Sequence, residues 1–195
     1  MAFYFDSKPD AKSNEKMIKC EINGRLYNFY TDNNVFSKKY LDFGTRTLLE
    51  SIDITEIEGD VLDIGCGYGP IGIYIKSSCE CNVDMVDINE RALSLAKKNA
   101  ELNRVEANIF LSDIYSNVDK KYDFIITNPP IRVGKKILYE ILFGAKNYLN
   151  DDGVLYLVIN KDQGAKSLKK SLDKCYNVTT LKKNKGFYVF KCQMR

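Results

Sequence analysis

Short apolar runs alternate with longer amphipathic stretches between residues 60 and 175, and this pattern predicts strands that take turns with helices. The apolar runs predict strands at 61–64, 83–87, 108–111, 122–127 and 153–160. The stretches between and after them predict helices at 69–76, 90–102, 136–149 and 162–175. Asp162 is a candidate N-cap for the last of these helices. Strands that alternate with helices form a parallel sheet with helices on both faces, so we expect an α/β fold.

The C-terminal segment departs from this alternation. Two β-prone runs at 177–181 and 187–192 are joined by only a few Lys, Asn and Gly residues. A connection this short cannot cross over to a parallel strand, so the two strands must pair antiparallel. We therefore expect a three-layer, Rossmann-like architecture in which a mostly parallel sheet is closed by a C-terminal antiparallel hairpin.

The N-terminal segment predicts an appendage to this sheet. Two β-prone runs at 17–22 and 25–31 flank Asn23-Gly24, which is the strongest short-range signal for a β-hairpin. A loop follows, and a helix is expected near residues 40–52. We expect this hairpin and helix to form a cap or substrate lip on the main sheet.

Chain length and composition narrow the class of protein. A chain of 195 residues is expected to form one domain, 1–195, with the cap at 1–55 and a ligand-binding core at 56–195. The hydrophobic share of 45% and the charged share of 28% are those of a soluble globular protein. No apolar run is long enough to span a bilayer, and residues 1–10 lack the apolar stretch of a secretory signal. We therefore expect a cytoplasmic protein without a membrane partner.

The chain contains no histidine, and this excludes several kinds of chemistry. Nucleophilic machinery of the Ser-His or Cys-His type, histidine metal sites and a histidine general base are all ruled out. Six cysteines are present, but none follow a C-x-x-C spacing, so we expect free thiols and no bound metal. The net charge of +3 is compatible with a nucleic-acid partner without requiring one.

Glycines follow directly after the first strand of the predicted sheet, at positions where a nucleotide-like ligand can approach the backbone closely. One interpretation is a dinucleotide site, because Gly67, Gly69 and Gly72 match G-x-G-x-x-G. A second is an S-adenosylmethionine site in the G-x-G-x-G pattern that starts at Gly65, and a third is a tight turn without a ligand. Asp63 favours the second, because its carboxylate would repel a pyrophosphate but attract sulfonium and ammonium charges.

Acidic residues also stand at the carboxyl ends of the next two predicted strands. Asp87 can accept both hydrogen bonds of a ribose diol, although an acid in this place can instead stabilise a helix N-terminus. Asp113 can accept from an adenine amine, although alone it would be an ordinary loop aspartate. Together with Asp63, these acids follow three consecutive strands, which favours a single ligand site.

The segment Asn128-Pro129-Pro130-Ile131 ends the fourth predicted strand. Consecutive prolines stiffen the backbone and leave carbonyl groups exposed. The Asn128 side-chain oxygen and the Pro129 carbonyl can both accept from an NH₂ group, which directs the nitrogen lone pair toward a methyl donor. An Asn-Pro turn is common by itself, but its place in a sheet with the glycine turn predicts that Asn128, Pro129 and Pro130 are catalytic.

These motifs together resemble class I S-adenosylmethionine-dependent methyltransferases that methylate amino nitrogens. Segments 29–37, 42–45 and 128–135 are similar more narrowly to small, single-domain relatives of the 16S ribosomal RNA guanine-N(2) methyltransferases (RsmC type). The resemblance covers about residues 25–192 and implies S-adenosylmethionine as cofactor and ribosomal RNA or the small ribosomal subunit as partner. The cofactor-binding residues that it implies are Asp63, Gly65, Cys66, Gly67, Gly69, Asp87, Ile88, Asp113, Ile114 and Asn128.

The chain departs from the family pattern at Ile131, where many N-P-P enzymes carry an aromatic residue that stacks on a flipped base. Phe36 is a candidate for the missing stacking partner, although a phenylalanine of the core is an equally good interpretation. Arg132 and Lys135 follow the motif directly, where the phosphate of an RNA would lie. We therefore expect Phe36, Ile131, Arg132 and Lys135 to contact the substrate.

Several functions stay open on the sequence alone. Within the same fold, the methylated nitrogen could belong to a protein glutamine amide or to adenine in DNA. A NAD-type dehydrogenase would use the second glycine pattern, and a noncatalytic RNA-binding module could keep the fold without the reaction. The Asn128 motif and the lead-in segments favour the guanine amine of 16S ribosomal RNA.

Overall fold

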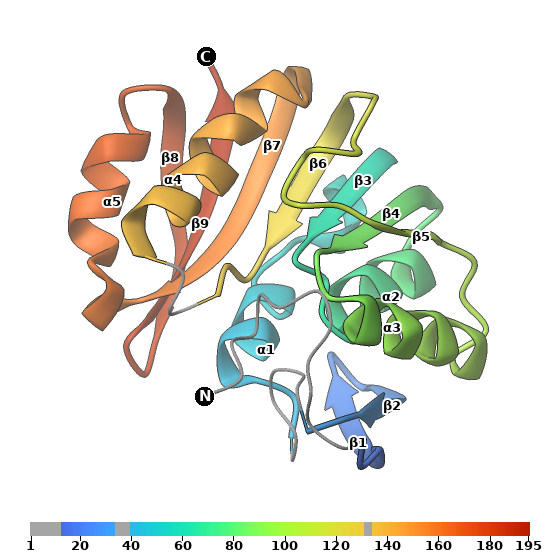
Figure 1. Ribbon diagram of the computed structural model, residues 1–195. Coiled ribbons are helices and arrows are strands. Elements are labelled where there is room, and N and C mark those ends of the chain that lie inside the picture. Colours follow the sequence, from blue (N-terminus) through green and yellow to red (C-terminus); the bar gives the residue numbers. More distant parts are fainter. Residues whose placement is uncertain (1–12, 34–39, 131–133) are drawn as a thin grey trace.

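The computed structural model describes residues 13–33, 40–130 and 134–195, and its centre is a seven-stranded sheet (Figure 1). The strands are β3 (Gly59–Ile64), β4 (Cys81–Asp87), β5 (Asn108–Leu111), β6 (Tyr122–Thr127), β7 (Leu149–Asn160), β8 (Tyr176–Asn184) and β9 (Phe187–Met194). Their order in the sheet is β5-β4-β3-β6-β7-β9-β8. Strands β3 to β7 pair parallel, whereas β9 pairs antiparallel with both β7 and β8. This confirms the expected parallel sheet closed by an antiparallel hairpin.

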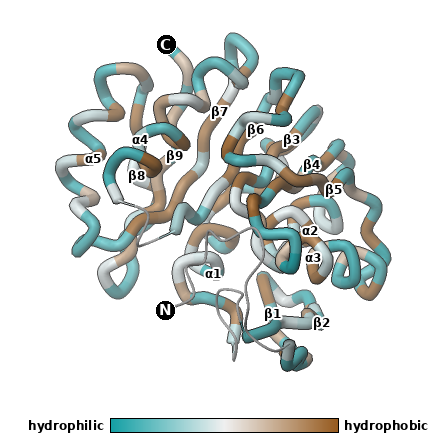
Figure 2. Tube along the Cα trace, in the orientation of Figure 1, coloured by the Kyte–Doolittle hydropathy of each residue, from teal (hydrophilic) through white to brown (hydrophobic). Residues whose placement is uncertain are grey.

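Helices cover both faces of the sheet (Figure 1). They are α1 (Phe43–Leu49), α2 (Pro70–Ser78), α3 (Glu90–Leu102), α4 (Gly134–Gly144) and α5 (Ala165–Leu172). Alternate residues of β7 belong to different apolar clusters: Tyr156 and Val158 to one shared with α1, α2 and α3, and Leu155 and Leu157 to one shared with α4 and α5. The part of β7 that is buried on both faces is therefore continuously apolar, and Figure 2 shows apolar residues at the centre of the sheet.

The N-terminal hairpin consists of β1 (Lys16–Ile22) and β2 (Arg25–Thr31), which pair antiparallel as a separate sheet. Asn23 and Gly24 form its turn with φ of 47° and 79°, as a two-residue turn matched to the strand twist requires. The hairpin lies beside α2 and α3 (Figure 1), and Phe29 meets the ring of Tyr68 edge-on at 5.6 Å between ring centroids. The expected hairpin is confirmed, and it packs directly on the loop between β3 and α2.

One buried side chain ties the hairpin to this loop. Asn99 of α3 accepts from the Tyr30 N–H at 2.6 Å and donates to the Tyr30 carbonyl at 3.0 Å. Its amide also donates to the Tyr68 carbonyl at 2.8 Å. Since the Asn99 side chain is fully buried, each of these groups depends on the others for its hydrogen bonds.

The structure corrects several helix boundaries. The helix expected at 162–175 is split into a 3₁₀ turn, η3 (Lys161–Gln163), and the shorter α5, because Gly164 takes the left-handed φ of 84° between them. Asp162 is not an N-cap; Asn160 caps η3 by accepting from the Asp162 N–H at 3.0 Å. The remaining short 3₁₀ helices are η1 (Ile54–Glu56) and η2 (Ala145–Asn147).

Two further expected helices are shorter than the sequence pattern suggests. The helix expected at 136–149 ends at Gly144, and β7 begins at Leu149 because that residue already pairs with Tyr122 across a bulge in the ladder. The helix expected near 40–52 reduces to α1, which starts after its N-cap Asp42. Among the described residues, no helix is both long and apolar enough to cross a membrane.

Replacing Asn99 by alanine should lower the free energy of unfolding by roughly 2–4 kcal/mol, because it leaves buried groups of Tyr30 and Tyr68 without partners. Urea denaturation of the purified chain measures this. Asn103→Ala is the matched control, since Asn103 makes equivalent bonds to Asn28 from a partly exposed position and should lose less. Equal losses in the two variants would contradict the role given to Asn99.

Candidate functional site

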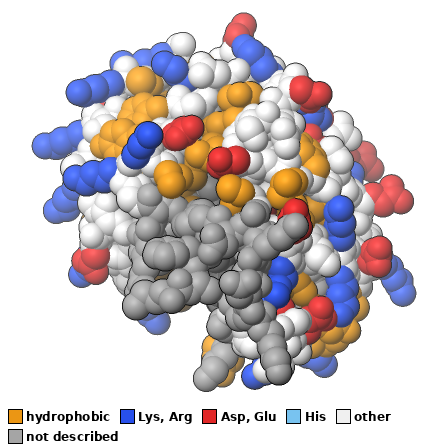
Figure 3. All heavy atoms as spheres, in the orientation of Figure 1, with side chains coloured by type: hydrophobic (Ala, Val, Ile, Leu, Met, Phe, Trp, Pro, Cys, Tyr) orange, Lys and Arg blue, Asp and Glu red, His pale blue; other side chains and the backbone are white. Residues whose placement is uncertain are grey.

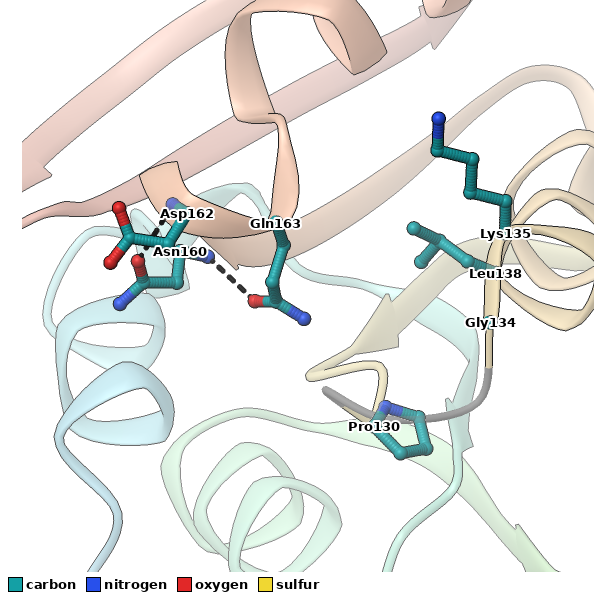
Figure 4. Close-up of a pocket in the computed structure, with 7 residues that line it drawn as sticks. All are labelled: Pro130, Gly134, Lys135, Leu138, Asn160, Asp162 and Gln163. Carbon is teal, nitrogen blue, oxygen red and sulfur yellow. Dashed lines mark hydrogen bonds between the residues drawn. The ribbon is translucent and has the colours of Figure 1, made fainter.

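Two cavities open at the carboxyl ends of the parallel strands, and Pro130 lines both of them. The first has a volume of about 240 Å³ and lies above β3, β4 and β5. Several expected cofactor residues line it: Gly65, Asp87, Ile88, Asp113 and Ile114. The second has a volume of about 470 Å³ and lies between the start of α4 and the end of β7 (Figure 4). The residues after β6 thus separate two binding spaces.

The glycine turn after β3 is held against β4. The N–H groups of Gly65 and Cys66 both donate to the Val86 carbonyl at 2.9 Å. Gly65, Gly67 and Gly69 have φ of 69°, 57° and 93°, which are values that residues with a side chain rarely adopt. Of these residues Gly65 lines the cavity, whereas Cys66, Gly67 and Gly69 are not among its lining residues.

Asp63 lies fully buried under the turn. Its Oδ2 accepts from the Gly72 N–H at 2.9 Å, while Oδ1 has no hydrogen-bond partner among the described residues. Gly72 is required here because a Cβ on it would lie 2.3 Å from Sδ of Met85. Burial raises the pKa of Asp63 to about 7, and the charge of Asp87 adds to this shift. An uncompensated buried carboxylate of this kind fits a site that receives a cation.

Asp87 stands at the end of β4 with its carboxylate held from two sides. Oδ2 accepts from the Gly67 N–H and Oδ1 from the Asn89 N–H, both at 2.9 Å. Burial raises its pKa despite these bonds. The N-cap of α3 is Asn89, which accepts from Arg91 and Ala92. Asp87 is therefore not needed as a cap, and its remaining lone pairs are available to the cavity that it lines.

The loop after β5 carries an unusual backbone conformation. Ile114 has a φ of 51°, in the left-handed region that costs a β-branched residue about 1–3 kcal/mol. Ser112 holds it there, since its hydroxyl donates to the Ile114 carbonyl at 2.9 Å and accepts from the Asn117 N–H at 3.1 Å. Asp113, exposed beside it, and Ile114 both line the cavity. Such strain is characteristic of functional sites.

Asn128 is fixed by hydrogen bonds to the N-terminal cap. Its Nδ2 donates to Asp42 Oδ2 and to Thr45 Oγ1, both at 2.9 Å. The same Asp42 oxygen accepts from the Thr45 N–H at 2.8 Å and so caps α1. Because only the nitrogen of an amide can donate, these contacts fix which way the side chain faces. Its oxygen is left as an acceptor for another group.

The other expected site residues have different positions. Pro129 is buried, and Lys135 is exposed and lines the second cavity. Phe36, Ile131 and Arg132 lie outside the described residues, so their expected contacts with the substrate are not tested.

Sequence reasoning missed the roles of Asp42 and Thr45. Both belong to the lead-in segment 42–45, which resembles the family, yet each lies more than 80 residues from Asn128 in the chain. The only local signal is an acid three residues before a threonine at a helix start, which indicates an N-cap and nothing more.

The charge around the first cavity favours a cationic ligand. Asp87, Asp113 and Glu140 line it and Asp63 lies beneath, whereas no described lining residue is Lys or Arg. Carboxylates so arranged would repel a pyrophosphate and attract a sulfonium or an ammonium group. Within residues 13–33, 40–130 and 134–195, no group of His, Cys, Asp and Glu side chains is placed to hold a metal ion.

Comparison with known proteins agrees with this geometry. Residues 26–191 match the family model described as methyltransferase small domain. The chain is 41% identical to the uncharacterized protein YbxB of Bacillus subtilis over 195 residues, covering 97% of both chains. It is also 41% identical to the ribosomal RNA small subunit methyltransferase C of Haemophilus influenzae over 136 residues, which are 67% of this chain. The chain spans only 41% of that relative's length.

Solved structures share the fold. The 16S rRNA N2 methyltransferase RsmC of T. thermophilus, in complex with AdoMet and guanosine, superposes with a TM-score of 0.83 at 26% identity. The alignment covers 93% of this chain and 51% of that one. A ribosomal protein L11 methylase from Lactobacillus delbrueckii, at 20% identity and a TM-score of 0.68 over 78% of both chains, shows the same fold. These matches confirm the resemblance to class I methyltransferases, and the dehydrogenase alternative fails. The chain belongs to the methyltransferase small domain family and is an S-adenosylmethionine-dependent methyltransferase.

Proposed function

We propose that this chain transfers the methyl group of S-adenosylmethionine to the exocyclic amine of a guanine in 16S ribosomal RNA. The observation that carries the proposal is the fixed orientation of Asn128. Its Nδ2 is held by Asp42 and Thr45, so Oδ1 is left as an acceptor two residues before Pro130, which lines both cavities. An acceptor in that place suits an NH₂ group as substrate.

The cofactor is assigned to the cavity above β3, β4 and β5. Asp87 would accept from the ribose hydroxyls, and Ile88, Asp113 and Ile114 would surround the adenine. Gly65 gives the methionine part close access, because an added Cβ there would meet only open space. The buried charge of Asp63 would stabilise the cationic end of the cofactor. When bound, the cofactor supplies an electrophilic methyl group.

The proposed reaction depends on the orientation of the target amine more than on a general base that removes its proton. Asn128 Oδ1 and the Pro129 carbonyl would each accept one hydrogen of the target amine, which turns the nitrogen lone pair toward the methyl group. The N–C bond forms as the S–C bond breaks, and S-adenosylhomocysteine leaves. The nitrogen releases its proton to solvent once it carries the positive charge, so the absence of histidine is no obstacle.

The distribution of charge favours RNA as the substrate. Residues 134–195 carry 13 Lys and Arg against 5 Asp and Glu, a net charge of +8, whereas residues 1–133 carry 16 against 21, a net charge of −5. Lys and Arg side chains gather over α5 and β8 along one edge of the molecule (Figure 3). Lys135, Lys161 and Lys166 are exposed on the same C-terminal part. A surface of this kind can bind the phosphates on either side of a target base.

The proposal is tested by transfer of a labelled methyl group to 16S RNA and to small subunits from a strain that lacks this chain. We expect 2-methylguanosine by mass spectrometry of the nucleosides. Asn128→Ala should lower kcat by about 10²–10⁴-fold, because the orientation of the target amine is lost. Asn177→Ala, on the exposed face of β8, is the matched control. Label found only in protein or in DNA adenine would contradict the proposal.

Thr45→Val should slow single-turnover methyl transfer by at least about 10-fold. It keeps the size of the side chain but leaves one Asn128 N–H without an acceptor, so the amide can turn. Thr45→Ser retains the hydroxyl and should stay close to wild type. If the serine variant were as slow as the valine variant, the hydroxyl would not be what positions Asn128.

Asp63→Asn should raise the stability of the cofactor-free protein at pH 8 by roughly 1–3 kcal/mol and weaken its binding of S-adenosylmethionine. The folded pKa of about 7 lies above the usual range, so wild type loses stability as pH rises toward 7 and the neutral amide does not. Denaturation at pH 5 and pH 8, with calorimetry of cofactor binding, measures both effects. The same stability gain at both pH values would show that the buried charge is not its cause.

A further inference from the structure

The second cavity presents a hydrogen-bond donor whose direction is set by the protein. Its walls come from Pro130 and the start of α4 on one side and from the end of β7 with η3 on the other. Among these walls is Gln163, whose side chain points toward Pro130 across the cavity in Figure 4. The second cavity shares Pro130 with the cofactor cavity and none of its other described lining residues.

The orientation of the Gln163 amide follows from a capping box. Gln163 Oε1 accepts from the Asn160 N–H at 2.9 Å, and Asn160 Oδ1 accepts in return from the Asp162 N–H at 3.0 Å. Because a backbone N–H can only donate, the oxygen of Gln163 must face it. Nε2 then faces the cavity, and it has no partner among the described residues.

We propose that the second cavity receives the target base and that Gln163 donates from Nε2 to an acceptor atom, N3 or O6, on the guanine ring. This rests on the proposed function, which places the exocyclic amine at Asn128. The Pro130 ring and the Leu138 side chain, on the side of the cavity facing Gln163, offer apolar surface to the base (Figure 4). An apolar surface of this kind takes the place of the stacking aromatic that the chain lacks at Ile131.

The side-chain amides of Asn128 and Gln163 would each recognise a different part of the guanine base. Asn128 presents an oxygen because its nitrogen is bound by Asp42 and Thr45, and Gln163 presents a nitrogen because its oxygen is bound by Asn160. The site thus offers one acceptor for the amine and one donor for a ring acceptor. Uracil would not be a substrate, because it has no exocyclic amine to donate to Asn128. The hydrogen bond from Gln163 Nε2 to a ring acceptor would hold the guanine in place while its amine reacts.

Gln163→Glu isolates the donor. The introduced carboxylate can still accept from the Asn160 N–H, so the capping box is kept, while the N–H groups toward the cavity are lost. At pH 8 we expect kcat/KM for 16S RNA or small subunits to fall about 10–100-fold, with cofactor binding and the melting temperature close to wild type. Asn82→Asp, which adds the same charge at the exposed start of β4 and lines neither cavity, should keep wild-type activity.

The pH dependence of the activity of Gln163→Glu distinguishes a hydrogen-bond donor at position 163 from a purely structural residue. A carboxyl group placed in the cavity regains an O–H donor when it is protonated, and contact with the base raises its pKa. The activity of Gln163→Glu relative to wild type should therefore rise about 10-fold between pH 8 and pH 5.5. A ratio that stays constant with pH, or a variant as active as wild type at pH 8, would overturn the role of Gln163. If wild type itself methylates no RNA, the proposed function fails instead.

Discussion

The hydrogen bonds from Asn128 to Asp42 and Thr45 are the interaction on which the site depends. They join the core sheet to the first turn of α1, so the N-terminal cap fixes the orientation of the residue that we propose as the acceptor of the target amine. Asn99 adds a second link, between the hairpin and Tyr68 of the glycine turn. In the proposed reaction the N-terminal cap would therefore act in two places: it would orient the acceptor for the target amine and support the glycine turn at the cofactor site.

Asp63 and Asp87, beneath and beside the first cavity, have charges that lower the stability of the fold but favour a cationic ligand. Asp63 and Asp87 are buried within one small region, and the pKa of each is raised because burial disfavours its charge. In the cofactor-free protein they lower stability at neutral pH, as groups with a raised carboxyl pKa do. Under the proposed function, the positive charge of the bound cofactor would offset this loss of stability and would contribute to its own binding. Ile114, which lines the same cavity as Asp87, has a backbone in the left-handed region.

The features that could be predicted from the sequence are those that short, local residue patterns encode. The glycine turn, the acids at the strand ends and the 128–130 motif are each contiguous or periodic. Gly65, Asp87 and Asp113, which the sequence predicts as cofactor-binding residues, line one cavity. The hydrogen-bond partners of the Asn128 and Gln163 side chains could not be found in this way. Asn128 contacts a distant segment of the chain, and Gln163 belongs to a helix cap that differs from the expected one. Asp42 meets Asn128 only in the folded chain, and the left-handed Gly164 moved the expected cap from Asp162 to Asn160.

The orientation of Asn128 in the presence of substrate is the most direct test of this account. A crystal structure with S-adenosylhomocysteine and guanosine would show it. We predict that the guanine N2 atom lies about 3 Å from Asn128 Oδ1 and from the Pro129 carbonyl, while Nδ2 keeps its bonds to Asp42 and Thr45. A guanine whose amine faces away from Asn128, or an Asn128 released from Asp42 and Thr45, would contradict it.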